Sequence, residues 1–173
     1  MVIRPLEPGD RRALERFVGR VPEGDRTFFK EDVETPEVID AWTRPGPARA
    51  VAIANGEIVG YVAVVPLHGW SDHVGEVRVI VDPSHRGRGI GRALARRAVL
   101  EAVALDLDKM VVEVVADQAP TIAMFRALGF DPEALLTDHV RDRAGALRDL
   151  MILAQSVETQ WSAMAVTGIA DEL

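Results

Sequence analysis

The apolar residues of the chain recur in two periods, which predict an alternation of helices and strands. Apolar residues three and four positions apart, such as Leu14, Phe17, Val18 and Val21, are typical of an amphipathic helix. This spacing predicts helices over residues 8–21, 35–42, 89–105 and 119–130 and in the tail 156–173. Short apolar runs between turn residues predict strands over 2–6, 48–54, 57–67, 75–81 and 109–116, and two more around Ala144-Gly145.

The order of these elements predicts the fold class. A strand is followed by two helices, three strands, a helix, a strand, a helix, two strands and a last helix. Asn55-Gly56 lies between two apolar runs and predicts a hairpin with a type I′ turn. We expect a mixed α/β protein of the α+β type, in which helices cover a largely antiparallel twisted sheet of six to seven strands.

Composition narrows the classes of function. The 173 residues carry a formal net charge of −7, which disfavours binding to nucleic acid or to an anionic membrane. No apolar run approaches the ~20 residues that span a bilayer, and the first residues lack the apolar stretch of a signal peptide. The absence of cysteine excludes a thiol nucleophile, a thiolate metal site and disulfides. We expect a cytoplasmic protein without a metal.

One segment, "DPSHRGRGIGRAL" at residues 82–94, concentrates three glycines and three arginines where a predicted strand runs into a predicted helix. A helix N-terminus presents unpaired backbone N–H groups, and glycines let the backbone approach a bulky anion. Arginines can add charge-assisted hydrogen bonds. This segment therefore predicts a phosphate site on a protein that is acidic elsewhere.

Two common phosphate motifs do not fit this segment. The dinucleotide motif G-x-G-x-x-G fails, because counting from Gly87 puts Arg92 at its last position and counting from Gly89 puts Leu94 there. A P-loop needs Gly-Lys-Ser/Thr, which the chain lacks. The pattern Arg/Gln-x-x-Gly-x-Gly/Ala does fit, with Arg86, Gly89 and Gly91 in its fixed positions.

In that spelling the segment resembles the acetyl-CoA pyrophosphate loop of the GNAT superfamily of N-acetyltransferases. The likeness extends to a preceding strand that ends in "VIVDP", a following strand "VVEVVADQ" and a helix that ends in "TIAMFRALGF". It covers roughly residues 2–153 and is strongest over 76–130. It implies helices on both faces of the sheet and fourth and fifth strands that splay apart to admit acetyl-CoA as co-substrate.

The resemblance also implies which residues bind acetyl-CoA. The main chain of the fourth strand bonds the pantetheine arm, residues 86–92 hold the pyrophosphate, and the helix after the fifth strand adds two positions. On this chain they are Val79, Ile80, Val81, Arg86, Gly87, Arg88, Gly89, Ile90, Gly91, Arg92, Gln118 and Phe125. Phe125 stands where the family often has a tyrosine that protonates the leaving thiolate, so that role is in doubt, and Tyr61 is expected in the core.

The reaction that the resemblance implies is direct attack of a primary amine on the thioester in a ternary complex. A base must remove a proton from the amine, and a strand amide near Val79 or Ile80 can stabilise the oxyanion. Glu113, which interrupts an apolar strand, and Glu76, which begins the fourth strand, are the candidate bases. Histidines 68 and 73 remain less favoured alternatives.

The acceptor site and the tail complete the expectations. The family places the loop between the first helices and the last hairpin around the acceptor, here Asp25, Phe28, Phe29, Glu31, Asp32, Trp42, Asp138, His139 and Arg141. We divide the chain into a domain over 1–155 and a helical extension over 156–173. The extension carries an apolar stripe at Val157, Trp161, Met164 and Ala165, which packs on its own subunit or across a two-fold axis, and we expect a homodimer.

A second class of function stays open. Because Phe125 replaces the usual acid, the chain can instead be a non-catalytic acyl-CoA-binding or regulatory module. Binding of nucleic acid through "HRGRGIGRALARR" is disfavoured by the net charge and by the lack of interleaved aromatic residues.

Overall fold

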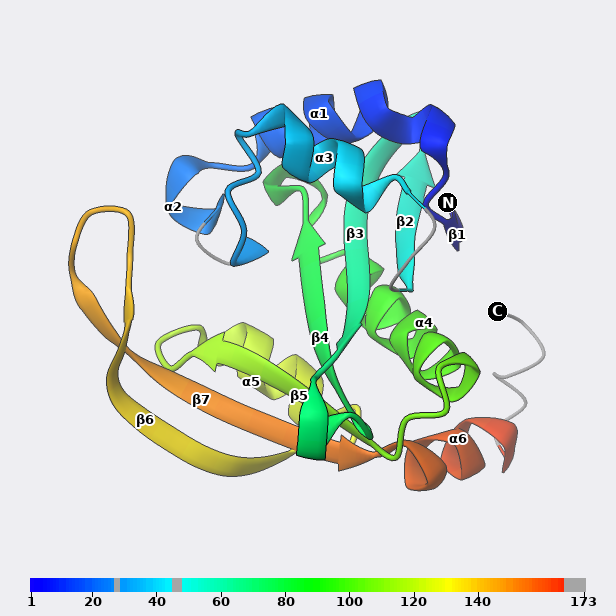
Figure 1. Cartoon of the computed structure of the whole chain (residues 1–173), viewed down its shortest axis with the longest axis vertical. Helices are drawn as coiled ribbons and strands as arrows, with labels where there is room; N and C mark the ends of the chain where they lie inside the picture. Colours follow the sequence, from blue (N-terminus) through cyan, green and yellow to red (C-terminus); the bar gives the residue numbers. More distant parts are fainter. Residues whose placement is uncertain (27–28, 45–47, 167–173) are drawn as a thin grey trace.

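One twisted sheet of seven strands organises the protein, as the computed structural model of the chain shows for residues 1–26, 29–44 and 48–166 (Figure 1). The strand order is β1-β2-β3-β4-β5-β7-β6, and only β4 and β5 pair in parallel among these described strands. The strands are β1 (Val2–Pro5), β2 (Arg49–Ala54), β3 (Glu57–Pro66), β4 (Val74–Val81), β5 (Lys109–Val115), β6 (Asp131–Arg141) and β7 (Leu147–Ser156). The predicted mixed, largely antiparallel sheet is confirmed.

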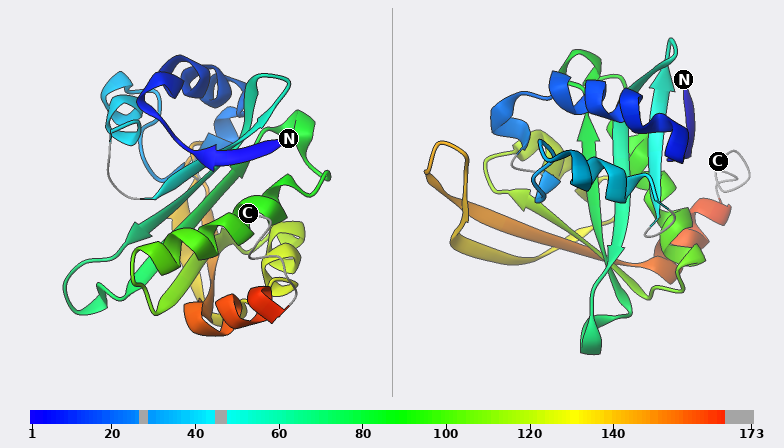
Figure 2. Two further views of the ribbon diagram at one scale, coloured as in Figure 1. Left: turned by 90° about the vertical axis from the view of Figure 1, so that its right-hand side faces the viewer. Right: turned by 45° about the horizontal axis from the view of Figure 1, so that its top comes forward.

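Helices cover both faces of the sheet (Figures 1 and 2). The α-helices are α1 (Arg11–Arg20), α2 (Glu23–Arg26), α3 (Pro36–Trp42), α4 (Ile90–Ala104), α5 (Ala119–Arg126) and α6 (Val157–Val166). Residues of α4 and α5 pack in one apolar core and residues of α1 and α3 in another. Side chains of β4 alternate between the two, since Val79 packs against the first and Ile80 lies in the second.

The apolar periods predicted most elements well. Leu14, Phe17, Val18 and Val21 are all buried, as the helical spacing indicated. Asn55 and Gly56 both have positive φ, 52° and 78°, which a type I′ turn requires. The sequence did not indicate α2, because a single helical turn is too short to show a period.

The pairing between β4 and β5 is short. It joins Val74 to Lys109, Gly75 to Met110 and Glu76 to Val111, and no further pair follows along these two fully described strands. The rest of β4 continues to Val81 beside β3, while β5 turns toward β7, and the strands diverge (Figure 1). The splay that the resemblance implied is confirmed. It opens a wedge whose apex lies at Glu76 and whose wide end lies at the glycine-rich loop.

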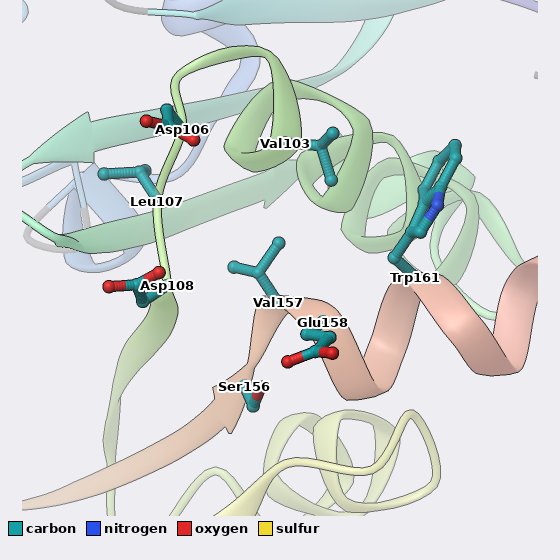
Figure 3. A pocket seen from close by; sticks show the side chains of 8 residues that line it. All are labelled: Val103, Asp106, Leu107, Asp108, Ser156, Val157, Glu158 and Trp161. Atoms are coloured by element: carbon teal, nitrogen blue, oxygen red, sulfur yellow. The ribbon is translucent and has the colours of Figure 1, made fainter.

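The last helix packs beside α4. Val157, at its start, is buried in the same core as α4, and β7 ends directly before it at Ser156. Trp161 stays 37% exposed beside Val103, above a surface pocket of about 410 Å³ (Figure 3). The side chains of Met164 and Ala165, the rest of the predicted stripe, lie outside the described residues. The division at residue 155 stays a prediction.

No helix among the described residues is both long and apolar enough to cross a bilayer.

Candidate active site

The glycine-rich loop offers free space and unpaired donors at the start of α4. Gly87 and Gly89 have φ of 74° and 80°, and a Cβ built on either would meet nothing within 4 Å. The first hydrogen bond of the helix runs from Ala93 N–H to Gly89 C=O, so the N–H groups of residues 90–92 have no acceptor within the helix. A fifteen-residue helix adds its dipole to these donors. The loop therefore fits a pyrophosphate.

Asp82 fixes the entrance to this loop. Its carboxylate is 2% exposed, accepts hydrogen bonds from the Ser84 N–H and hydroxyl, and pairs with Arg20 at 2.8 Å. Burial alone would raise the pKa of Asp82, but the bonds from Ser84 and Arg20 outweigh it and hold the pKa well below its usual range. Because Arg20 also donates to the Ile58 carbonyl, Asp82 ties the loop to α1 and β3.

The three arginines of the loop differ in their surroundings. Arg86 donates to Asp25 of α2 at 2.6 Å and to the Val81 carbonyl at 3.3 Å. Arg88 and Arg92 are exposed beside the helix N-terminus. A phosphate bound there would meet Arg88 and Arg92 directly, whereas Arg86 is held against α2 by an acidic partner.

The free edge of β4 presents the main chain of alternate residues to the wedge. Leu67 N–H bonds Val74 C=O, and Asp82 N–H bonds Val59 C=O, so the even-numbered residues of β4 direct their main-chain groups toward β3. The odd-numbered residues Val77, Val79 and Val81 direct theirs toward the wedge. The main chain of Ile80 is committed to β3 opposite Tyr61.

Two glutamates and a lysine meet at the apex of the wedge. Glu76 belongs to the last residue pair between β4 and β5, and Glu113 lies two residues beyond its partner Val111. Lys30 Nζ lies 2.5 Å from Glu76 Oε1 and 2.5 Å from Glu113 Oε2. The structure thus brings the two candidate bases together around a primary ammonium group.

Glu76 is the more enclosed and the more strongly bound of the two carboxylates. Its residue is 8% exposed, and Arg78 donates to it from Nε at 3.1 Å and from Nη2 at 3.2 Å. Burial alone would raise the pKa of Glu76, but the hydrogen bonds from Arg78 and Lys30 lower it below the ordinary value. Glu113 receives a bond from Lys30 and is about one-third exposed. Glu113 is therefore better placed to exchange protons with solvent.

A third glutamate extends this cluster. Glu31 Oε1 accepts from Arg78 Nη1 at 2.7 Å, and Glu31 Oε2 accepts from Trp42 Nε1 at 2.7 Å. The segment that carries Lys30 is thus bound to β4 and to α3. Sequence reasoning missed Lys30 and Arg78. The sequence pattern could have indicated only Arg78, because residues two positions apart on a strand, such as Glu76 and Arg78, lie on the same face.

The other predicted residues of the donor site are placed as follows. Phe125 is 1% exposed and packs edge to face on Phe130 with ring centroids 5.3 Å apart. Gln118 occupies the N-cap position of α5 without a capping bond from its side chain and is half-buried. Tyr61 is buried as expected, and burial raises the pKa of its hydroxyl to about 12. His68 and His73 are exposed in the connection between β3 and β4.

The expected walls of the acceptor site are brought together only in part. Arg143, at the tip of the β6–β7 hairpin, pairs with Glu34 of the α2–α3 connection at 3.3 Å. The hairpin stands beside α2 in Figure 1. Phe29 and Trp42, however, are 1% and 3% exposed and belong to the core rather than to a wall, which corrects the prediction. The Trp42 ring stacks on Tyr61 and the Phe29 ring lies tilted against both, so burial of the three aromatic rings stabilises this arrangement.

Five more of these residues stand apart from the apex, and one is not described. Asp25 is bound to Arg86, and Asp32 accepts from the Thr35 hydroxyl. Asp138 and His139 are exposed on β6, where Arg141 donates to the Gly145 carbonyl. Phe28 lies outside the described residues.

Comparison with known proteins agrees with this geometry. The chain is 28% identical over 158 residues to the N-acetyltransferase YjgM of Escherichia coli (strain K12), covering 86% of this chain and 95% of YjgM. It is 30% identical over 141 residues to the L-amino acid N-acetyltransferase AaaT of the same organism, covering 77% of this chain and 84% of AaaT.

A solved structure shares the fold. YncA, a putative acetyltransferase of Salmonella typhimurium solved with its cofactor acetyl-CoA, superposes with a TM-score of 0.75 at 22% identity, over 90% of this chain and 93% of that one. The sequence pattern of the acetyltransferase (GNAT) family matches residues 17–130. The wedge, the loop and these matches agree: the chain belongs to the GNAT family of acetyltransferases.

Proposed function

We propose that the protein transfers an acetyl group from acetyl-CoA to a primary amine by direct attack in a ternary complex. The observation that carries this proposal is the apex of the wedge, where Glu76 and Glu113 bind the primary ammonium group of Lys30. Two carboxylates at this place fit an acceptor that arrives as a cation. The wedge between the strands fits the arm of the donor.

Residues of the loop and of β4 would hold acetyl-CoA, which supplies the acetyl thioester. The N–H groups of residues 90–92 and the exposed Arg88 and Arg92 fit its pyrophosphate. The main chain of Val77, Val79 and Val81 fits the pantetheine amides, because an extended arm can add itself to a free strand edge. With its phosphates at the loop, an arm laid along β4 carries its thioester toward the apex.

Glu113 would act as the base and Glu76 as the anchor of the acceptor ammonium. An alkyl ammonium has a pKa of about 10.4, so a proton must leave before the nitrogen can attack. The lowered pKa of Glu76 keeps its carboxylate ionised, which suits an anchor for a cation. A main-chain N–H at the free edge, such as that of Val79, would stabilise the oxyanion. Phe125 donates no proton, so the thiolate would be protonated through solvent.

The test is a screen of acetyl-CoA turnover against amines, followed through the release of free thiol. L-amino acids head the panel because AaaT is an L-amino acid N-acetyltransferase, and polyamines and peptides with free N-termini follow. Thiol release that requires a primary amine, with the acetylated amine identified by mass, is the expected outcome. Thiol release at the same rate with tertiary amines would contradict the proposal.

A non-catalytic acyl-CoA-binding module is the second candidate, and Phe125 favours it. Such a module binds acetyl-CoA in calorimetry and releases no thiol with any acceptor. The two functions therefore separate in one pair of measurements on the same preparation.

Two further properties belong to this proposal. We infer a homodimer, supported by the exposed Trp161 on the last helix, and we test it below. We also infer a cytoplasmic location, supported by the acidic, cysteine-free composition.

A further inference from the structure

We propose that Lys30 is itself an acetyl acceptor, so that the protein modifies its own chain at Lys30 Nζ. This inference rests on the proposed function, because it uses the same donor and the same apex. What it adds is a modification site within the protein.

The position of Lys30 Nζ is that of an acceptor nitrogen. It contacts a carboxylate from each of the two strands that border the wedge, at 2.5 Å in both cases. The wedge opens directly beyond Glu76, and the loop lies at its other end. A donor held at the loop and extended along β4 therefore brings its thioester toward the nitrogen that these carboxylates already hold.

The segment around Lys30 holds the side chain at the apex. Phe29 and Val33, on either side of it, are 1% and 4% exposed. Lys30 itself has φ of 61°, a left-handed conformation that has an energetic cost for a residue with a side chain. The bonds of Glu31 to Arg78 and Trp42 offset this cost. The side chain of Lys30 thus reaches the apex from the face of the sheet opposite α4.

The composition of the chain provides an internal comparison. Of its twenty basic residues only two, Lys30 and Lys109, are lysines, and arginine is not an acetyl acceptor of this chemistry. Lys109 begins β5 and pairs with Glu133 on the surface at 2.7 Å. Both lysines carry the same primary amine and differ in their position in the structure. A difference between their acetylation rates therefore reflects position.

The atoms of the step balance. Glu113 takes one proton from the Lys30 ammonium group and passes it to solvent. The nitrogen lone pair then forms a bond to the acetyl carbon as the carbon–sulfur bond breaks. A second proton of the nitrogen leaves to solvent, and the departing thiolate takes up a proton to become the free thiol. The third proton of the original ammonium group stays on the amide nitrogen. No oxidant, reductant or further reactant is needed.

The experiment incubates the full-length protein with acetyl-CoA and no added amine. We expect the chain to gain the mass of one acetyl group, and peptide mapping to place it on Lys30. Proximity at the apex should make Lys30 react on the order of 10²-fold faster than Lys109. The first-order rate constant should not change with protein concentration, since the acceptor belongs to the same chain.

Three variants test the acceptor lysine, a control lysine and the base. Lys30→Arg keeps the charge and should abolish the modification, whereas Lys109→Arg, its matched control, should leave it unchanged. Glu113→Gln should slow it strongly while the affinity for acetyl-CoA in calorimetry stays the same. Equal acetylation of Lys30 and Lys109 would overturn the proposal, because it would indicate non-specific chemical acetylation.

The amine screen on the same preparation separates the two proposals. If added amines are acetylated and Lys30 is not, the self-modification is refuted and the proposed function stands. If acetyl-CoA binds and neither Lys30 nor any amine is acetylated, both are refuted. Acetylation of Lys30 alone supports the inference and makes this chain its own acceptor.

Discussion

At the scale of single residues, two buried carboxylates with lowered pKa values have different tasks. Asp82 is bound by Arg20 and Ser84 and holds the entrance of the loop. Glu76 is bound by Arg78 and Lys30 and faces the place where the reaction would occur. In both cases the hydrogen bonds outweigh burial, so the charge stays on the carboxylate. Both have an arginine partner, and what distinguishes Glu76 is its additional bond to an exchangeable ammonium group.

The first prediction concerns Asp82. Asp82→Asn should lower the free energy of unfolding at pH 7 by about 1–3 kcal/mol, because a buried charged acceptor of several hydrogen bonds is lost. The lowered pKa stabilises the wild type fully above the pKa of the unfolded chain, about 3.9. The difference between variant and wild type should therefore shrink as pH falls below about 4.

Urea unfolding at pH 7, 4 and 3 measures this difference. Asp72→Asn, at an exposed turn position, is the control and should change little at any pH. A gap for Asp82→Asn that stays constant down to pH 3 would show that the charge of Asp82 does not stabilise the fold.

The second prediction separates the two glutamates. Glu113→Gln should reduce kcat by about 10²–10⁴-fold and remove the acid limb of the rate profile, because the base is lost. Glu76→Gln should chiefly raise KM, because the anchor of the acceptor cation is weakened. Steady-state rates across pH, with acetyl-CoA affinity measured separately, test both. The reverse pattern would make Glu76 the base.

At the scale of elements, the strand, loop and helix over residues 74–104 form the proposed donor site, and most of that proposal came from sequence alone. The motif is local, since Arg86, Gly89 and Gly91 lie within six residues, and its conformation follows from glycine and the helix N-terminus. The main-chain direction along β4 was not predictable, because it depends on the register with β3. That register assigns Val77, Val79 and Val81 to the wedge and Ile80 to β3.

The third prediction tests the loop. Gly89→Trp should abolish acetyl-CoA binding, because the indole would fill the open space in front of the N–H donors. Gly56→Trp is the matched control, because Gly56 also has positive φ and open space around it. The substitution there should strain the backbone by a similar amount, roughly 1–2 kcal/mol, at a position outside the loop. Calorimetric titration of acetyl-CoA into both folded variants measures the two affinities. Unchanged affinity in Gly89→Trp would refute the site.

At the scale of the whole molecule, the apex of the wedge lay beyond sequence reasoning. Glu113 was predicted from its place within an apolar strand and Glu76 from its place at the start of the fourth strand, but Lys30 reaches them from a segment without any apolar period. The same limit applies to Phe29 and Trp42, whose burial depends on α1, α3 and β3 meeting in one core. Periodicity tells which face of an element is apolar, and it does not tell which distant loop covers that face.

The fourth prediction concerns assembly. Trp161→Glu should convert the expected homodimer into a monomer, because a charge would disrupt an apolar contact made by α6. A point variant is preferable to truncation after Gln155, since truncation would also remove the core residue Val157. Trp70→Glu is the control, because Trp70 is 97% exposed in the connection between β3 and β4 and does not belong to α6. Light scattering at several concentrations gives the mass. A wild-type monomer throughout would refute the dimer.

Because β4 pairs with β5 over only a short stretch, binding of the donor can be detected from the hydrogen-exchange rates of individual backbone amides. Without a donor, the N–H groups of Val77, Val79 and Val81 have no strand partner across the wedge, whereas those of Arg78 and Ile80 are already bonded to β3. Binding along this edge should slow exchange at residues 79 and 81 and leave 78 and 80 nearly unchanged. A protection pattern that alternates residue by residue would record, within one strand, how the donor lies against the chain.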